Sequence, residues 1–218
     1  MSQSIARSVG ALIALSLSTF AYVTTETLPI GLLLPIADDL GSTESAVGLL
    51  VTSYGLVVVV TSIPLTQLTR RVPRRALLTG LLAVFVLATV VSAMARSYGI
   101  LLGARVITAL SQALFWSIVV PTAASLFPAR VRGRALGVVM TGSSLAAVLG
   151  VPAGTWLGQQ AGWRVSFLAL SGIGLVAMLG TARLLPGGPA PQGQAARSEN
   201  PDARRYWLLM GMTVLTVT

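Results

Sequence analysis

The chain has 218 residues, of which 54% are hydrophobic and only 10% are charged, and its formal net charge is +9. Soluble domains carry about a quarter charged residues, so this chain has too few to cover a water-facing surface. Cys and His are both absent, which excludes disulfides, His-dependent metal sites and imidazole catalysis, and all 15 basic residues are arginines gathered between apolar runs, an arrangement that argues against a nucleic-acid partner.

Six apolar runs follow one another along the chain, separated by charged or Pro/Gly-rich breaks. Each has about the 20 residues needed to cross a hydrocarbon core of ~30 Å. The first run is too long for the apolar part of a signal peptide, and no clear cleavage site follows it. We predict an all-α integral membrane protein with a six-helix bundle over residues 1–185. The predicted spans are Ser8–Leu34, Ser45–Leu68, Ala76–Ala95, Tyr98–Phe127, Ala135–Leu157 and Val165–Leu185.

The remaining residues have a different composition. Residues 186–205, with the sequence PGGPAPQGQAARSENPDARR, are rich in Pro, Gly, Ala and Arg, which is typical of a flexible linker. A seventh apolar run begins at Tyr206 and has 13 residues, too few to span a bilayer. We predict a cytoplasmic linker at 186–205 and the start of a seventh transmembrane helix at 206–218, and we expect the sequence to be a fragment of a longer protein.

The distribution of arginine predicts the orientation of the chain, because cytoplasmic loops carry an excess of basic residues. With the N-terminus inside, twelve arginines fall on the cytoplasmic side, and only Arg96 and Arg164 fall outside. We therefore predict a multi-pass protein of the cell membrane whose N-terminus is cytoplasmic. The twelve are Arg7, Arg70, Arg71, Arg74, Arg75, Arg130, Arg132, Arg134, Arg183, Arg197, Arg204 and Arg205.

Arg70, Arg71, Arg74 and Arg75 form a basic loop between the second and third predicted spans. Anchoring to anionic lipid headgroups accounts for such a loop. A role in gating is the more specific hypothesis for the same four residues.

Two charged residues lie deep inside the predicted spans, Glu26 in the first and Arg105 in the fourth, whereas Arg183 lies at the cytoplasmic end of the sixth. A charge at the bilayer centre costs about 2.5–3.5 kcal/mol on insertion scales, so it usually faces a cavity or a partner. At about 1.5 Å per helical residue, both lie roughly 10–15 Å from the same side of the bilayer and can interact. Polar and aromatic residues share a helical face with each charge. Those predicted to line a substrate cavity are Tyr22, Thr25, Gln112 and Trp116.

Two interpretations of Glu26 and Arg105 stay open. One is a buried structural ion pair that fixes the packing of two helices. The other is proton coupling, because desolvation makes a carboxylate hold a proton more readily while a nearby arginine opposes this. Movement between the two groups would then switch the proton on and off, and a lipophilic cation could compete for the same carboxylate.

Small residues recur every four positions along the fifth predicted span. Small-xxx-small faces let another helix approach closely, and Pro152 is expected to bend or loosen the helix because it removes a backbone hydrogen bond. Ordinary helix packing explains this face, and a sealed or sliding interface is the functional alternative. The residues are Gly142, Ala146, Gly150, Gly154 and Gly158.

Four stretches, in this order, resemble the N-terminal half of a major facilitator superfamily transporter. They are TETLPIGLLLPIADDLGS, RRVPRR, LLGARVITALSQALFW and GVPAGTWLGQQAGWRVSF. The chain is most similar to twelve-helix bacterial drug/proton antiporters, including the chloramphenicol-resistance and arabinose-efflux branch. The resemblance covers nearly the whole chain. It implies two inverted three-helix repeats, followed by a linker and the start of helix 7.

The resemblance also implies roles for particular residues. Arg105 matches the helix 4 arginine that such families link to proton transfer, and Glu26 matches the acid of helix 1. Gly150, Pro152 and Gly154 match the antiporter motif of helix 5, although its usual Gly-Pro is split here as Gly-Val-Pro. The loop motif departs from the family pattern, which has Gly, Asp and Gly at three positions. Those positions hold Thr66, Arg70 and Pro73, while Arg71, Arg74 and Arg75 are kept.

These likenesses imply a proton-coupled exporter of small lipophilic drugs whose partners are the lipid bilayer and a second six-helix half. An exporter of sugars or other metabolites, and a half that is inactive by itself, are the alternatives. An intramembrane serine protease is a poor match, because Ser143 has no His to act as its general base. We therefore predict a transporter rather than an enzyme, with no metal ion and no cofactor.

Overall fold

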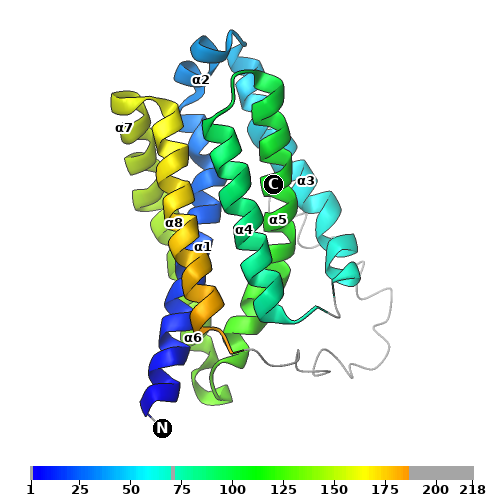
Figure 1. Ribbon diagram of the computed structural model, residues 1–218, viewed down its shortest axis with the longest axis vertical. Helices are drawn as coiled ribbons and strands as arrows, with labels where there is room; N and C mark the ends of the chain where they lie inside the picture. The colour runs from blue at the N-terminus through cyan, green and yellow to red at the C-terminus, as the bar shows by residue number, and fades with distance from the viewer. Residues whose placement is uncertain (1, 70–71, 187–218) are drawn as a thin grey trace, which may run out of the picture. The chain divides into compact units, whose positions relative to one another are not determined.

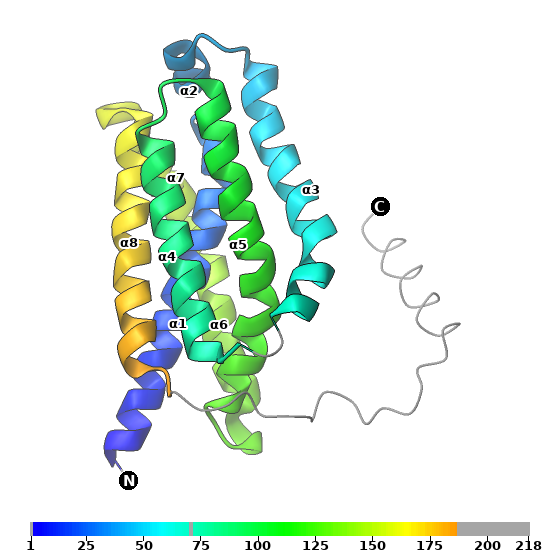
Figure 2. The same cartoon turned by 45° about the vertical axis from the view of Figure 1, so that its right-hand side comes forward.

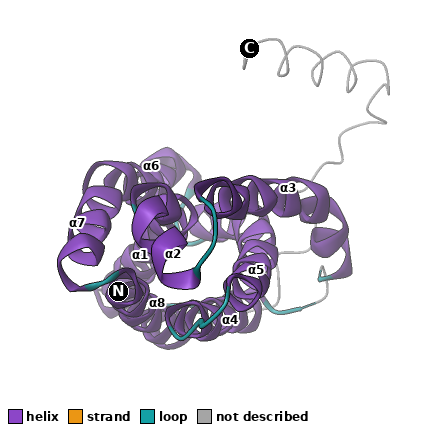
Figure 3. Ribbon diagram, turned by 90° about the horizontal axis from the view of Figure 1, so that it is seen from above, coloured by secondary structure: helices purple, strands orange, loops and turns teal. Residues whose placement is uncertain are grey.

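A computed structural model describes residues 2–69 and 72–186. This part of the chain contains helices and loops but no strand (Figures 1 and 3), and six of its helical segments are long and apolar enough to cross a membrane. The prediction of an all-α bundle with six spans is thereby confirmed. The helices are α1 (Ser2–Gly31), α2 (Leu33–Leu40), α3 (Glu44–Leu68), α4 (Arg74–Ala93), α5 (Tyr98–Ser125), η1 (Ala129–Val131), α6 (Arg132–Leu145), η2 (Ala146–Gly150), α7 (Val151–Ala161) and α8 (Trp163–Leu184).

Some predictions concern residues outside the described part of the chain. These are the linker from residue 187 onward, the start of a seventh helix, and the positions of Arg70 and Arg71. They stay predictions.

The first span is shorter than the predicted Ser8–Leu34 helix at its C-terminal end. α1 ends at Gly31, and the separate short helix α2 begins at Leu33. Pro35 explains the break, because its ring lacks an amide hydrogen and would clash with the carbonyl four residues earlier, that of Gly31. α2 then ends at Gly41, whose φ of 57° is the left-handed conformation that glycine adopts without strain.

The fifth span is interrupted by a wider helical turn. α6 passes into the π-helical segment η2 and then into α7, so the span runs from Arg132 to Ala161 rather than over the predicted Ala135–Leu157. Pro152 cannot donate to the carbonyl of Val148, four residues earlier, and its ring would clash with that carbonyl. Widening the preceding turn to π geometry relieves the clash.

The six spans pack in a pattern that repeats after three helices. α1 packs against α8 and the fifth span, α5 packs against α4 and α3, and α4 packs against α8. If the first, second and third spans are exchanged with the fourth, fifth and sixth, the same pairs of spans remain in contact. Two inverted three-helix repeats require this symmetry. α3 lies at one edge of the bundle (Figures 2 and 3) and is the least buried of the six spans.

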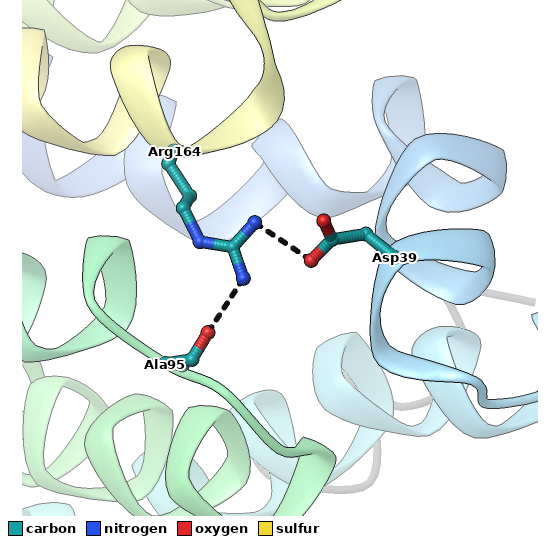
Figure 4. Close-up of polar contacts among 3 residues, drawn as sticks. All are labelled: Asp39, Ala95 and Arg164. Atoms are coloured by element: carbon teal, nitrogen blue, oxygen red, sulfur yellow. Dashed lines mark hydrogen bonds and ion pairs between the residues drawn. The ribbon is translucent and has the colours of Figure 1, made fainter.

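The helices α4 and α8 each carry an arginine in the first turn that reaches the far end of the other helix. Arg75 donates to the carbonyl of Ala182, and Arg164 donates to the carbonyl of Ala95 at 2.8 Å. Arg164 also pairs with Asp39 of α2, with Nη1 and Oδ2 2.6 Å apart (Figure 4). The Arg164 contacts hold three segments together at the end of the bundle that carries α2, and the Arg75 contact joins α4 to α8 at the opposite end. The two arginines occupy equivalent places in the two repeats.

Replacing Arg164 with alanine is expected to lower the free energy of unfolding by about 1–2 kcal/mol, and Asp39→Asn by less than about 1 kcal/mol. The pair is partly exposed, at 36% and 40% of the two side chains, and ion pairs in water contribute only about 0.2–1 kcal/mol. Arg164→Ala additionally loses the hydrogen bond to Ala95. Unfolding of the detergent-solubilised protein at low and high salt measures both effects. Equal losses from the two variants would contradict a separate contribution from the carbonyl contact.

Candidate functional site

Glu26 lies in the last third of α1, three residues before Pro29. Its side chain is half-buried, and its Oε2 accepts a hydrogen bond from Nε2 of Gln112 on α5 at 2.6 Å. An N–H donor stabilises the charged form of a carboxylate. The acid is therefore held by a neutral amide from the facing helix.

Arg105 is 1% exposed and binds the backbone of α1. Its Nη1 donates to the carbonyl of Thr25 at 2.5 Å, and its Nη2 donates to the carbonyl of Glu26 at 2.8 Å. In an uninterrupted helix the Thr25 carbonyl would accept from the amide of residue 29, but that residue is proline and has none. Pro29 thus leaves a carbonyl free, and Arg105 supplies the missing donor.

The side chains of Arg105 and Glu26 are brought together without forming an ion pair. Among the described residues, the salt bridge within 4.0 Å joins Arg164 and Asp39 instead. The sequence therefore predicts the proximity of the two charges correctly, while the contact runs through the backbone carbonyl of Glu26. The carboxylate stays free to bind another donor.

Tyr54 on α3 completes the site and was not among the predicted residues. It is fully buried, and its hydroxyl donates to Oε1 of Gln112 at 2.7 Å. The Arg105 guanidinium carbon lies 4.5 Å from the centroid of the Tyr54 ring, within the range of a cation–π contact. A tyrosine amid the aliphatic residues of α3 is the signal that could have identified it, because a buried phenol needs a hydrogen-bond partner.

These four side chains form one closed network across three spans. Glu26 binds Gln112, Gln112 binds Tyr54, Tyr54 contacts Arg105, and Arg105 returns to the Glu26 backbone. The network contains one acid, one cation and one amide that can reverse its donor and acceptor ends. It can hold a negative charge, accept a proton on that charge, or bind a cation there.

The other predicted cavity residues lie in different surroundings. Tyr22 is fully buried between Phe85 and Phe115, with both ring centroids 4.6 Å away, and its hydroxyl lies within hydrogen-bond distance of the Leu81 carbonyl at 3.1 Å and the Ser111 hydroxyl at 3.2 Å. The Thr25 side chain is buried and its hydroxyl has no partner, whereas Trp116 is half-buried. Tyr22 thus belongs to the packed core. A role for Tyr22, Thr25 or Trp116 in a substrate cavity stays a prediction.

The small residues of the fifth span lie against α1. A Cβ atom added at Gly142 would lie under 3.0 Å from the backbone carbonyl of Ser16, a distance that real Cβ atoms do not adopt. Ser16 and Thr19 also donate to the carbonyls of Val138 and Val139, at 2.8 and 2.9 Å. A Cβ atom added at Gly150, Gly154 or Gly158 would instead meet a side chain, that of Thr24, Leu28 or Leu32, and Ala146 is fully buried.

An open apolar groove of about 320 Å³ runs beside this contact between α1 and α6. Glu26 and its three partners do not line it. The lining residues are Ile13, Ser16, Leu17, Phe20, Val138, Gly142 and Leu145.

The described part of the basic loop contacts helix ends. Arg74 donates to the carbonyl of Pro121 at 3.2 Å, and Arg75 donates to that of Ala182. Both side chains thus link α4 to neighbouring helices. Gating by this loop, like the antiporter role of the fifth span, stays a prediction. Among residues 2–69 and 72–186, no group of three His, Cys, Asp or Glu residues is placed to hold a metal ion.

Comparison with known proteins matches nearly the whole chain to one protein family. Residues 15–217 match the family model described as Major Facilitator Superfamily. A curated relative, the uncharacterized MFS-type transporter YtbD of Bacillus subtilis (strain 168), is 41% identical over 178 residues. That alignment covers 82% of this chain and 45% of YtbD, so the chain spans about half the length of this relative.

Two solved structures share the fold. A bacterial homologue of the human lysosomal transporter Spinster, in an inward-facing and unoccupied conformation, aligns with a TM-score of 0.70 and 20% identity, over 88% of this chain and 47% of that one. The peptide transporter POT in complex with sulfate aligns with a TM-score of 0.72 and 14% identity, over 97% of this chain and 44% of that one. At these identities the likeness shows the fold alone.

Proposed function

Because the chain belongs to the Major Facilitator Superfamily, whose members are transporters rather than enzymes, we propose that it is the N-terminal half of a proton-coupled exporter of small lipophilic compounds. Glu26 is the proton-binding group in this proposal. The observation that carries it is the placement of a single half-buried carboxylate among polar side chains of three spans, held by Gln112 and not neutralised by Arg105.

The contacts around Glu26 support its proposed role as the proton-binding group. A carboxylate removed from water resists charging, whereas hydrogen-bond donors and nearby cations favour the charged form. Both influences act here, because the Glu26 side chain is half-buried, while Gln112 donates to the carboxylate and Arg105 donates to the backbone carbonyls of Thr25 and Glu26. A rearrangement of α1 against α5 that breaks the Gln112 contact would favour proton uptake, and re-forming the contact would favour release.

The remaining elements of the proposal concern cargo and assembly. A second six-helix half would complete the substrate cavity, and the N-terminus lies in the cytoplasm in the predicted orientation. The direction of transport, out of the cell, is taken from the resemblance to drug/proton antiporters. Lipophilic cargo suits a site where a single carboxylate is surrounded by apolar spans. A compound carrying a positive charge would compete with the proton for Glu26, which provides the exchange that an antiporter needs.

Glu26→Gln is expected to abolish substrate-driven proton release. The amide keeps the size of the side chain and some of its hydrogen bonds but cannot take up a proton at neutral pH. The natural-length protein is placed in everted membrane vesicles energised to acidify their interior, and the pH gradient is followed as lipophilic cations are added. Glu44→Gln, at an exposed acid in the first turn of α3, is the matched control. Undiminished release by the Glu26 variant would remove this residue from coupling.

Export of sugars or related metabolites is the alternative cargo class. Gln112 and the half-buried Trp116, one helical turn apart on α5, offer the hydrogen bonding and stacking that a sugar ring requires. Competition between pentoses and lipophilic cations for binding to the purified protein separates the two classes. A half that is inactive by itself is the third possibility, and the size of the natural protein in its membrane tests it.

A further inference from the structure

We propose that Tyr54 is a positioning residue for proton uptake at Glu26. Through Gln112 it holds the amide with its N–H end toward the carboxylate, and protonation of Glu26 reverses that amide and is thereby transmitted to α3. This inference rests on the proposed function, namely that Glu26 takes up the coupled proton.

The first step concerns the orientation of one amide. Gln112 has an acceptor end and a donor end, and the Tyr54 hydroxyl occupies the acceptor end at 2.7 Å. An ionised carboxylate can only accept, so the donor end is directed at Glu26, where Nε2 and Oε2 are 2.6 Å apart, and the donation from Tyr54 to the other end supports this orientation. The reverse orientation would face the amide oxygen toward an ionised carboxylate, placing two acceptors against each other. The observed arrangement therefore suits the charged form of Glu26.

The second step concerns the protonated form. A protonated carboxyl group has an O–H that needs an acceptor. Rotating the Gln112 amide by half a turn presents Oε1 to that O–H and turns Nε2 toward the Tyr54 oxygen. The Tyr54 oxygen then accepts a hydrogen bond from Gln112, where the hydroxyl previously donated one. The hydroxyl hydrogen of Tyr54 must therefore rotate away from Gln112. Proton uptake on α1 thus changes a hydrogen bond made by α3, at the site of the Tyr54–Arg105 contact.

The third step concerns competing charges around Glu26. Arg105 reaches it from α5, but its two hydrogen bonds go to backbone carbonyls. From α3 the titratable group at the site is Tyr54 itself, and on α1 the nearest is Tyr22, which bonds to Leu81 and Ser111. The segments η2 and α7 carry no charged residue, and the arginines of α8 lie at its two ends. Gln112 is therefore the side chain through which the carboxylate is controlled.

The test compares pH profiles of substrate-driven proton release in the same vesicles. Tyr54→Phe removes the hydrogen bond that the Tyr54 hydroxyl donates to the Gln112 amide. The amide is then less firmly held with its N–H end toward Glu26, so the charged form of Glu26 is less stabilised. The pH of half-maximal release is expected to move upward by about one unit, which corresponds to a tenfold rise in the proton affinity of Glu26. Tyr98→Phe, which removes a hydroxyl bonded to the Ala46 carbonyl outside the network, is expected to leave the profile unchanged.

A double variant keeps the test decisive if Tyr54→Phe also weakens the fold. Because Tyr54 acts only through Gln112, Tyr54→Phe combined with Gln112→Leu should shift the profile no further than Gln112→Leu alone. Additive shifts, or a wild-type profile in Tyr54→Phe, would overturn the inference. The proposed function fails by a different result, namely proton release that persists in Glu26→Gln.

Discussion

Gly142→Ala is expected to lower the free energy of unfolding by about 1–3 kcal/mol, the usual cost of forcing an extra methyl group into a packed contact. The new Cβ would overlap the backbone carbonyl of Ser16 and the hydroxyl of Thr19, and backbone cannot move aside as a flexible side chain can. α1 and α6 would have to separate. Separation would stretch the hydrogen bonds that Ser16 and Thr19 make to α6.

Gly137→Ala provides the matched control for this prediction. Gly137 lies in the same helix, and a Cβ added there meets no atom within 4 Å. Alanine has the higher helix propensity, by about 1 kcal/mol, so this variant should be neutral or slightly stabilised. Thermal unfolding of the detergent-solubilised proteins measures both changes. Equal unfolding temperatures for the two variants would mean that α1 and α6 are not in close contact at Gly142.

The spans were predictable because a chain crossing lipid has few choices. Unpaired backbone groups are too costly in hydrocarbon, so each long apolar run must become a helix. The same physics marks Glu26 and Arg105, since charges inside such runs are rare. These features depend on nearby residues alone. The break before α2 was not predicted, because the first span was expected to reach Leu34 and helices α1, α3 and α5 each continue through a proline.

The partners of the charges depended on packing between helices. Helical periodicity groups Tyr22 with Glu26 on α1, yet Tyr22 packs in the aromatic core, while Tyr54 from another span reaches the site. Both are fully buried tyrosines, and no local pattern separates them. The packing of α3 against α5 determines that Tyr54, rather than Tyr22, contacts the charged residues. The contact of Arg105 was partly predictable. Pro29 indicates from the sequence that a backbone carbonyl lacks its amide donor, but only the fold shows which arginine supplies the donor.

The pairing of Arg105 with Pro29 leads to the second large effect. Arg105→Lys is expected to lower the free energy of unfolding by about 2–3 kcal/mol and to impair transport strongly. Lysine keeps the charge but lacks the planar fork that donates to two carbonyls at once and stacks on the Tyr54 ring. One charge-assisted hydrogen bond contributes about 1.5–3 kcal/mol, and the cation–π contact about 0.5–2. Arg96→Lys, at an exposed position before α5, should stay within about 0.5 kcal/mol of wild type.

A second substitution tests the cause rather than the size of this loss. Pro29→Ala restores an amide hydrogen that can donate to the Thr25 carbonyl, so α1 no longer needs Arg105 at that position. Arg105→Lys should therefore cost about 1 kcal/mol less in the Pro29→Ala background than in wild type, as measured by unfolding of all four proteins. Strictly additive losses would show that Arg105 stabilises the bundle independently of the proline. A reduced cost would mean that the proline creates the site that the arginine fills, and that two guanidinium nitrogens are held by backbone carbonyls rather than by the Glu26 carboxylate.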